Sequence, residues 1–158
     1  MRRGLSEGTA ADAASGSAIG QAVSLNQGSM LFSSPDISPD GEWIVFTNQG
    51  EKQEDLFIMR RDGTGLTQIT NDAYHDRGPR WSPDGKHIAF YSDRSGEYEI
   101  WLITSEGTGL ERITRTAEKK MVFYPIWSPD GERLLYRLSG APSFIKYIAK
   151  NEPADIPL

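Results

Sequence analysis

Few residues of this chain stand in a pattern that could do covalent chemistry. Gly4-Leu5-Ser6-Glu7-Gly8 matches the G-x-S-x-G pattern around a hydrolase nucleophile. That pattern works only where a strand precedes it and a helix follows it. Residues 1–18 are rich in Gly, Ala and Ser and have the periodicity of neither element. We therefore expect that Ser6 is not a nucleophile.

The two histidines, His75 and His87, do not complete a catalytic or metal-binding set. Two imidazoles are too few for a three-histidine zinc site. Adjacent residues such as His75 and Asp76 rarely face each other as a Ser-His-Asp triad requires. The chain contains no cysteine, so it has no thiol chemistry and no disulfide. We predict a protein that is not an enzyme, with no catalytic residue, no cofactor and no metal.

Three carboxylates recur within one tetrapeptide, Ser-Pro-Asp-Gly. A shared metal or acid–base role would need them close together, whereas copies in successive repeats lie one repeat apart. The tetrapeptide has the composition of a tight turn, in which Pro presets φ, Asp bonds its own backbone and Gly adopts a left-handed conformation. We interpret the recurring residues as structural: Asp40, Gly41, Asp84, Gly85, Asp130 and Gly131.

Apolar residues flank each turn on both sides, so we interpret each copy as a strand, a turn and a second strand. The turns start 44 and 46 residues apart, a period typical of one propeller blade. In the clearest copy we expect strands at 78–82, 87–92, 99–104 and 110–115. The second and third are continuous apolar runs and should be buried on both faces, while the polar fourth should be an outer edge. We predict an all-β fold, a partial β-propeller of about three four-stranded antiparallel blades.

The repeat period also assigns most of the chain to blades. Because a propeller needs about four blades to close, we expect an open array whose remaining blades come from a longer chain or a second copy. Its outer faces should expose Phe46, Ile58, Leu135 and Tyr147. The expected divisions are a flexible N-terminus at 1–18, an orphan outer strand at 19–27, blades at 33–71 and 77–115, an incomplete blade at 122–150 that lacks its fourth strand, and a tail at 151–158.

Charge and hydropathy exclude several kinds of partner. The 158-residue chain has a net charge of −5, which argues against nucleic-acid binding. No run reaches the roughly 18 apolar residues of a membrane helix, so we expect no membrane insertion. Met1-Arg2-Arg3 is basic, but no apolar signal-peptide core follows it.

The connections from second to third strands and from fourth to first strands should emerge at one end of the blades, here called the loop face. Its mixture of charged and aromatic residues suits a protein- or peptide-binding surface, although it also suits a solvated loop surface. We expect Tyr124 to pack inward, and Trp81, Trp101 and Trp127 to be core. The predicted partner-binding residues are Tyr74, His75, Asp76, Arg77, Arg94, Glu97, Lys119 and Lys120.

The repeat resembles the WD-like propeller repeat of TolB-type proteins. The resemblance is carried by the segments 62–70, 81–90 and 99–103, and it covers about residues 22–148. It implies part of a six-bladed propeller. It also implies a bacterial, periplasmic protein like TolB, which binds partner proteins of the cell envelope.

The resemblance leaves three functions open. We favour a non-enzymatic scaffold that binds a protein or peptide. The first alternative is the non-catalytic gating propeller of a serine peptidase of the tricorn or prolyl-oligopeptidase type. The second is the sensor propeller of a bacterial regulator. A hydrolase domain or a DNA-binding domain in the complete gene product would identify either alternative.

Overall fold

A computed structural model describes residues 31–50, 53–116, 120–140, 143–147 and 156–157. All regular structure in these residues is β-structure, and it forms three antiparallel four-stranded sheets, or blades. No helix of the described part is long and apolar enough to cross a membrane. The strands are β1 (Leu31–Ile37), β2 (Trp43–Gln49), β3 (Glu54–Arg60), β4 (Thr67–Gln68), β5 (Asp76–Trp81), β6 (Ile88–Ser92), β7 (Glu99–Ile103), β8 (Glu111–Arg112), β9 (Val122–Trp127), β10 (Arg133–Leu138), β11 (Phe144–Tyr147) and β12 (Ile156–Pro157).

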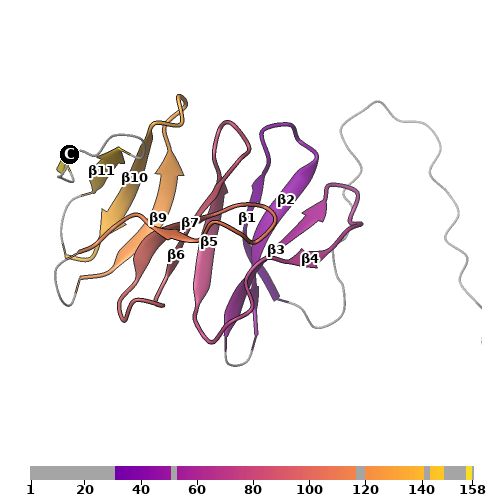
Figure 1. Cartoon of the computed structure of the whole chain (residues 1–158), viewed down its shortest axis with the longest axis horizontal. Helices are drawn as coiled ribbons and strands as arrows, with labels where there is room; N and C mark the ends of the chain where they lie inside the picture. Colours follow the sequence, from indigo (N-terminus) through magenta and orange to yellow (C-terminus); the bar gives the residue numbers. More distant parts are fainter. Residues whose placement is uncertain (1–30, 51–52, 117–119, 141–142, 148–155, 158) are drawn as a thin grey trace, which may run out of the picture.

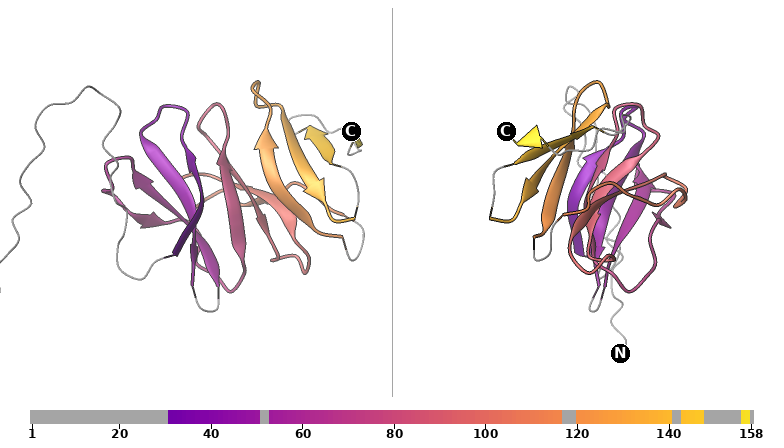
Figure 2. Two further views of the ribbon diagram at one scale, coloured as in Figure 1. Left: turned by 180° about the vertical axis from the view of Figure 1, so that it is seen from behind. Right: turned by 60° about the vertical axis from the view of Figure 1, so that its left-hand side comes forward.

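The three blades follow one another in chain order as an open row (Figure 1). Figure 2 shows the same succession from behind. Strands of the first blade contact the second, and strands of the second contact the third, while the described strands of the first and third blades do not meet. The predicted all-β partial propeller is therefore confirmed, and in this part of the chain it is not closed.

The third blade corrects one prediction. Residues 151–158 were expected to supply no fourth strand, yet β12 pairs with β11 through Ile145↔Ile156 and Phe144↔Pro157. The outer strands β4 and β8 are also only two residues long, so this position requires little pairing. Proline is tolerated there because an edge strand has no further neighbour that needs its N–H. The predicted N-terminus at 1–18 and the orphan strand at 19–27 lie outside the described residues.

The three Ser-Pro-Asp-Gly turns have the same hydrogen bonds. In each, the serine hydroxyl donates to the aspartate Oδ1 at 2.5 to 2.6 Å. The same hydroxyl accepts the backbone N–H of the residue five positions later, at or just before the start of the next strand, at 2.9 to 3.0 Å. The glycine N–H donates a hydrogen bond to the serine carbonyl. The φ values are 74°, 70° and 73° for Gly41, Gly85 and Gly131. The aspartates are thus engaged within their own turns.

Two apolar clusters lie between neighbouring blades, one on each side of the second blade. Alternation along β6 directs Ile88 and Phe90 toward the first blade and Ala89 and Tyr91 toward the third. This explains the continuous apolar runs, because a middle blade has a core on both faces. Trp81 is buried, whereas Trp101 and Trp127 are only partly buried, less than expected.

Two residues of the first blade that we expect from the sequence to be exposed are buried instead. Ile58 is buried because it packs into the cluster between the first and second blades. Phe46 points to the other face and is 1% exposed. Its ring lies 4.6 Å from that of Phe32 and 6.1 Å from that of Phe57, which cover it within the blade. Leu135 is partly buried.

A repeated feature that the sequence reasoning missed lies four residues before each turn. Ser34, Gly78 and Tyr124 each precede a proline, and their φ values are 51°, 60° and 56°. The pairing register of each first strand shifts at this place, so each carries a β-bulge. Serine and tyrosine are strained in this left-handed conformation.

Two glycine substitutions separate backbone strain from steric overlap. Gly85→Ala should lower the free energy of unfolding by about 1 kcal/mol, because a Cβ is disfavoured at positive φ. The new Cβ would meet nothing closer than Pro39 at 3.8 Å. Gly78→Ala should lose distinctly more, since its Cβ would lie 2.6 Å from the Tyr91 ring. Denaturant melts of both variants measure this, and equal losses would contradict the described packing at Gly78.

The open row also predicts how the chain associates. Leu31, Ile37 and Ile126 are well exposed, and Ile126 and Leu135 border a hollow of about 180 Å³ on the third blade. If a second copy supplies the remaining blades, light scattering should give a dimer at micromolar concentration. If a longer chain supplies them, the isolated chain should aggregate or bind a hydrophobic dye strongly. A monomer that melts cooperatively and binds no dye would contradict both.

Candidate functional site

The loop face is assembled from connections of successive blades, at the lower end of the blades in Figure 1. The β4–β5 and β6–β7 connections meet there through His75 and Asp93. The His75 backbone N–H donates to Asp93 Oδ1 at 2.9 Å, and its ring Nδ1 lies 2.7 Å from Asp93 Oδ2. His75 is partly exposed and its ring is held by this carboxylate.

Asp76 and Arg94 were predicted to bind a partner, and the structure corrects this. Arg94 donates to both carboxylate oxygens of Asp76, at 2.8 and 2.7 Å, and to Asp72 at 3.1 Å. Asp76 is fully buried, and the Arg94 side chain is 8% exposed. Burial raises the pKa of Asp76, while bonds from Ser92 and Arg94 act in the opposite direction. The pair is structural, and neither residue can reach a partner.

The same place holds a group of carboxylates that resembles a metal site. Oxygens of Asp55, Asp72 and Asp76 lie within 4.8 Å of one another. Their partners come from the protein, however. Arg94 contacts two of the three, and the side-chain amides of Gln53 and Gln68 donate to Asp55 at 2.8 and 3.1 Å. The arrangement already includes a cation, the Arg94 guanidinium.

Arg77 joins the first two blades at the loop face. Its Nε and one terminal nitrogen donate to the two oxygens of Glu54, the latter at 2.7 Å. Its guanidinium also lies 5.5 Å from the ring centre of Tyr98. Arg77 is partly exposed, but its charge is engaged in this pair. It is therefore a poor position for testing partner binding, because its removal would leave Glu54 without its partner.

An aromatic cluster, formed by Tyr91, Tyr98, Phe123 and Tyr124, lies between the second and third blades. Neighbouring ring centres are 5.5 to 6.0 Å apart. Burial raises the pKa of Tyr91 to about 12. Tyr124 was expected to pack inward, but it is 55% exposed because the bulge at Tyr124-Pro125 leaves its ring on the rim of the cluster.

The other predicted residues have mixed surroundings. Tyr74 is exposed and lies 5.6 Å from the Arg94 guanidinium, and Lys120 is exposed. Glu97 is partly exposed in the β6–β7 connection. Lys119 lies outside the described residues. Met121, exposed beside Lys120, was missed because a lone apolar residue in a loop carries no pattern.

The three four-stranded blades, with their connections gathered at one end, define a partial β-propeller. The TolB beta propeller domain matches residues 16–152, and the chain belongs to this family.

Solved structures agree with this assignment. The chain is similar to the putative TolB from Agrobacterium tumefaciens, with 25% identity, a TM-score of 0.64, and coverage of 81% of this chain and 43% of that one. It is also similar to TolB from Acinetobacter baumannii, with 26% identity, a TM-score of 0.64, and coverage of 79% and 31%. Lower similarity to an oligogalacturonate lyase in complex with manganese (19%) and to a puromycin-hydrolyzing peptidase from Mycobacterium tuberculosis (14%) shows the fold alone.

A curated protein of Agrobacterium fabrum, uncharacterized protein Atu1656, is 42% identical over 45 residues. That match covers 28% of this chain and 15% of that protein. The chain thus spans less than half the length of each of these relatives.

Replacing Arg94 tests the buried ion pair. Arg94→Met keeps an apolar stem but leaves Asp76 without a counter-charge. The free energy of unfolding should therefore fall by about 3 kcal/mol at neutral pH. The loss should shrink toward low pH, because protonated Asp76 needs no counter-charge. A carboxyl whose pKa is raised in the folded state stabilises the fold while it is protonated, and this contribution is lost as the pH rises. Denaturant melts at several pH values measure both effects.

Arg61→Met is the matched control, because Arg61 forms an exposed, 3.7 Å pair with Glu42. It should change stability by less than about 0.5 kcal/mol. Equal losses for the two variants would contradict a special role of Arg94.

Proposed function

We propose that this chain is a non-enzymatic β-propeller module that binds a protein or peptide through its loop face, in the bacterial periplasm. The observation that carries the proposal is the aromatic cluster with Tyr124 at its rim. Exposed tyrosine backed by other rings is the composition of interface hot spots. The periplasmic location rests on membership of the TolB family alone.

The backbone of Tyr124 supports a role beyond folding. The equivalent position of the second blade is Gly78, which adopts the same left-handed conformation without strain. A tyrosine here is less favourable for the fold than glycine, yet its ring stays exposed. Strained residues that remain at a surface are candidates for binding. Lys120 and Met121 extend the exposed surface along the same connection.

The buried Asp76–Arg94 pair gives the proposed surface a rigid base. It fixes the first residue of β5 to the β6–β7 connection, and Arg77–Glu54 fixes the first blade to the second. A surface held in one shape loses little conformational freedom on binding, which favours affinity. The proposed contact residues are therefore Tyr74, His75, Lys120, Met121 and Tyr124.

Selection from a displayed random-peptide library on the immobilised chain tests the proposal. Enriched peptides should bind Tyr124→Ala at least about tenfold more weakly, as expected on loss of a hot spot. Fluorescence anisotropy of labelled peptides measures the affinities. Glu111→Ala, on the exposed outer strand β8, is the control and should leave binding unchanged.

Two results would contradict the proposal. One is that no peptide is enriched above the unselected library. The other is that enriched peptides lose affinity with Glu111→Ala and keep it with Tyr124→Ala, which would place binding at the blade edge.

A further inference from the structure

Both interfaces between blades are built from the same positions. In each blade, the two residues before the Ser-Pro-Asp-Gly turn pair with two residues of the second strand, and the two pairs face opposite neighbours. We call the pair that faces the following blade the forward pair, and the pair that faces the preceding blade the rear pair. The forward pairs are Asp36–Val45, Arg80–Ala89 and Ile126–Leu135, and the rear pairs are Ile37–Ile44, Trp81–Ile88 and Trp127–Leu134.

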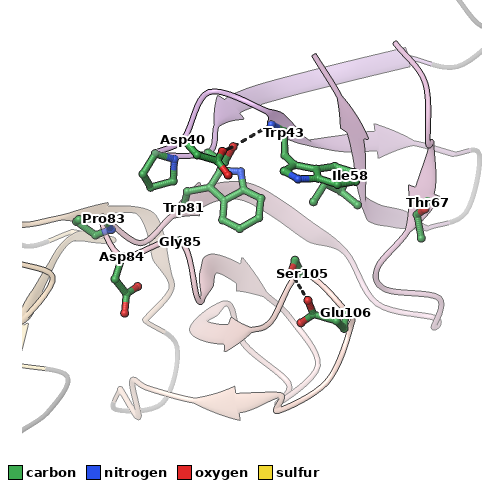
Figure 3. A pocket seen from close by; sticks show the side chains of 12 residues that line it. Asp40, Trp43, Ile58, Thr67, Trp81, Pro83, Asp84, Gly85, Ser105 and Glu106 are labelled. Carbon is green, nitrogen blue, oxygen red and sulfur yellow. Dashed lines mark hydrogen bonds between the residues drawn. The ribbon is translucent and has the colours of Figure 1, made fainter. Parts of the chain in front are cut away.

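The first interface joins the forward pair of the first blade to the rear pair of the second. Val45, Trp81 and Ile88 belong to one buried apolar cluster. Asp36 accepts the backbone N–H of Trp81 through its side chain, at 2.7 Å. Figure 3 shows Trp81 together with Trp43 of the first blade, where both line a cavity between the two blades. The rear tryptophan thus lies against the face of the preceding blade.

The second interface repeats this arrangement. Ala89 of the forward pair and Leu134 of the rear pair belong to the other apolar cluster, and Trp127 packs against it. The Nε1–H of Trp127 donates to the carbonyl of Arg80, a residue of the forward pair, at 3.1 Å. In both interfaces, therefore, a forward pair of one blade contacts the rear pair of the next.

The turns add a second repeated contact. A Cβ on Gly85 would lie 3.8 Å from Pro39 of the preceding turn, and a Cβ on Gly131 would lie 3.7 Å from Pro83. The proline of one turn thus neighbours the glycine of the next. At the start of the row, Gly41 has nothing described within 4 Å of this position. The proline of the third turn has no following turn in the described part of the chain.

Each end of the row has one pair that no described blade covers. Ile37, in the rear pair of the first blade, is 62% exposed, and Ile126, in the forward pair of the third, is 53% exposed. Ile126 and Leu135 border the hollow of about 180 Å³ on the third blade. Both end pairs are entirely aliphatic, whereas the interior forward pairs each include a charged residue. Terminal repeats normally have a polar outer face, which neither end has.

A second copy of this chain has the face that each end lacks. Its rear pair matches the forward pair Ile126–Leu135, and its forward pair matches the rear pair Ile37–Ile44, so each contact would join four aliphatic side chains. The blade count agrees with this. Closed propellers have about 4–8 blades. With three blades in each copy, two copies give six blades, whereas three copies would exceed this range.

We propose that two copies of this chain associate so that the third blade of each packs against the first blade of the other. Ile126 of one copy then contacts Ile37 of the other, as Asp36 contacts Trp81 within the chain. Both contacts use the same two faces, so the dimer has two-fold symmetry. They use none of the loop-face residues proposed above to bind a partner, so the dimer does not depend on the proposed function.

Charge-swapped variants test the contact. Ile37→Lys and Ile126→Asp each place a charge in both contacts of a dimer. Each variant alone should therefore be a monomer at micromolar concentrations at which the unaltered chain is a dimer. An equimolar mixture should form dimers again, because one contact then joins two isoleucines and the other joins lysine to aspartate. Light scattering measures the mass, and native mass spectrometry identifies the mixed dimer.

Leu110→Asp is the matched control, because Leu110 is 43% exposed in the β7–β8 connection of the second blade, away from both end pairs. It should remain a dimer. Cooperative melts establish that the variants are folded before their masses are compared. Ile126→Ala adds no charge and should weaken the dimer at least about tenfold, since it removes apolar contact twice. It replaces Ile126→Asp if that variant does not fold.

Three results would overturn the proposal. An unaltered chain that is monomeric, or that only aggregates, would show that the end pairs do not meet in a second copy, and blades of a longer chain would then be their neighbours. A dimer that persists in Ile126→Asp alone would place the interface elsewhere. A mixture that stays monomeric would show that forward and rear pairs of different copies do not join.

Discussion

Each blade is kept in register by one serine hydroxyl that bonds both sides of its turn. The hydroxyl donates to the aspartate two residues later and accepts the backbone N–H five residues later. Since side chains alternate along a strand, a shift of one residue would exchange the two faces of the blade. Ile88 would then face the third blade and Ala89 the first. The two apolar clusters between blades therefore depend on these turns.

The bulge before each turn has one backbone geometry and three different side chains. Its left-handed residue is Ser34, Gly78 or Tyr124, and proline follows in every case. In the second blade the residue at this position must be small, because the Tyr91 ring fills the space beside Gly78. In the third blade the tyrosine lies at the rim of the aromatic cluster instead. A repeated backbone thus allows each blade to present a different surface at one end.

Most of the architecture could be predicted, because turn chemistry and hydrophobic period are local signals. The turns at 44 and 46 residues placed the blades, and the apolar runs placed their inner strands. What failed depends on contacts distant in sequence. Asp76 and Arg94 look like surface charges in their loops, and only folding brings them together in a buried pair. Some missed information was nevertheless present in the spacing. Asp55 and Glu99 are 44 residues apart, as are Thr70 and Thr114, whose hydroxyls accept the backbone N–H of Leu56 and Ile100.

The two ends of the blades differ in how their polar groups are satisfied. At the loop face, Arg77 pairs with Glu54 of the first blade and Arg94 pairs with Asp76 within the second blade, while the side chains of Tyr74 and Tyr124 remain exposed. At the turn end, the aspartates are satisfied within their own turns, and their negative charge stays directed to solvent. The turns of the first and second blades border a cavity of about 460 Å³, whose lining includes Trp43 and Trp81. This cavity arises from one pair of neighbouring blades, whereas a central channel needs them all. It is therefore a property that an open row of blades can have on its own.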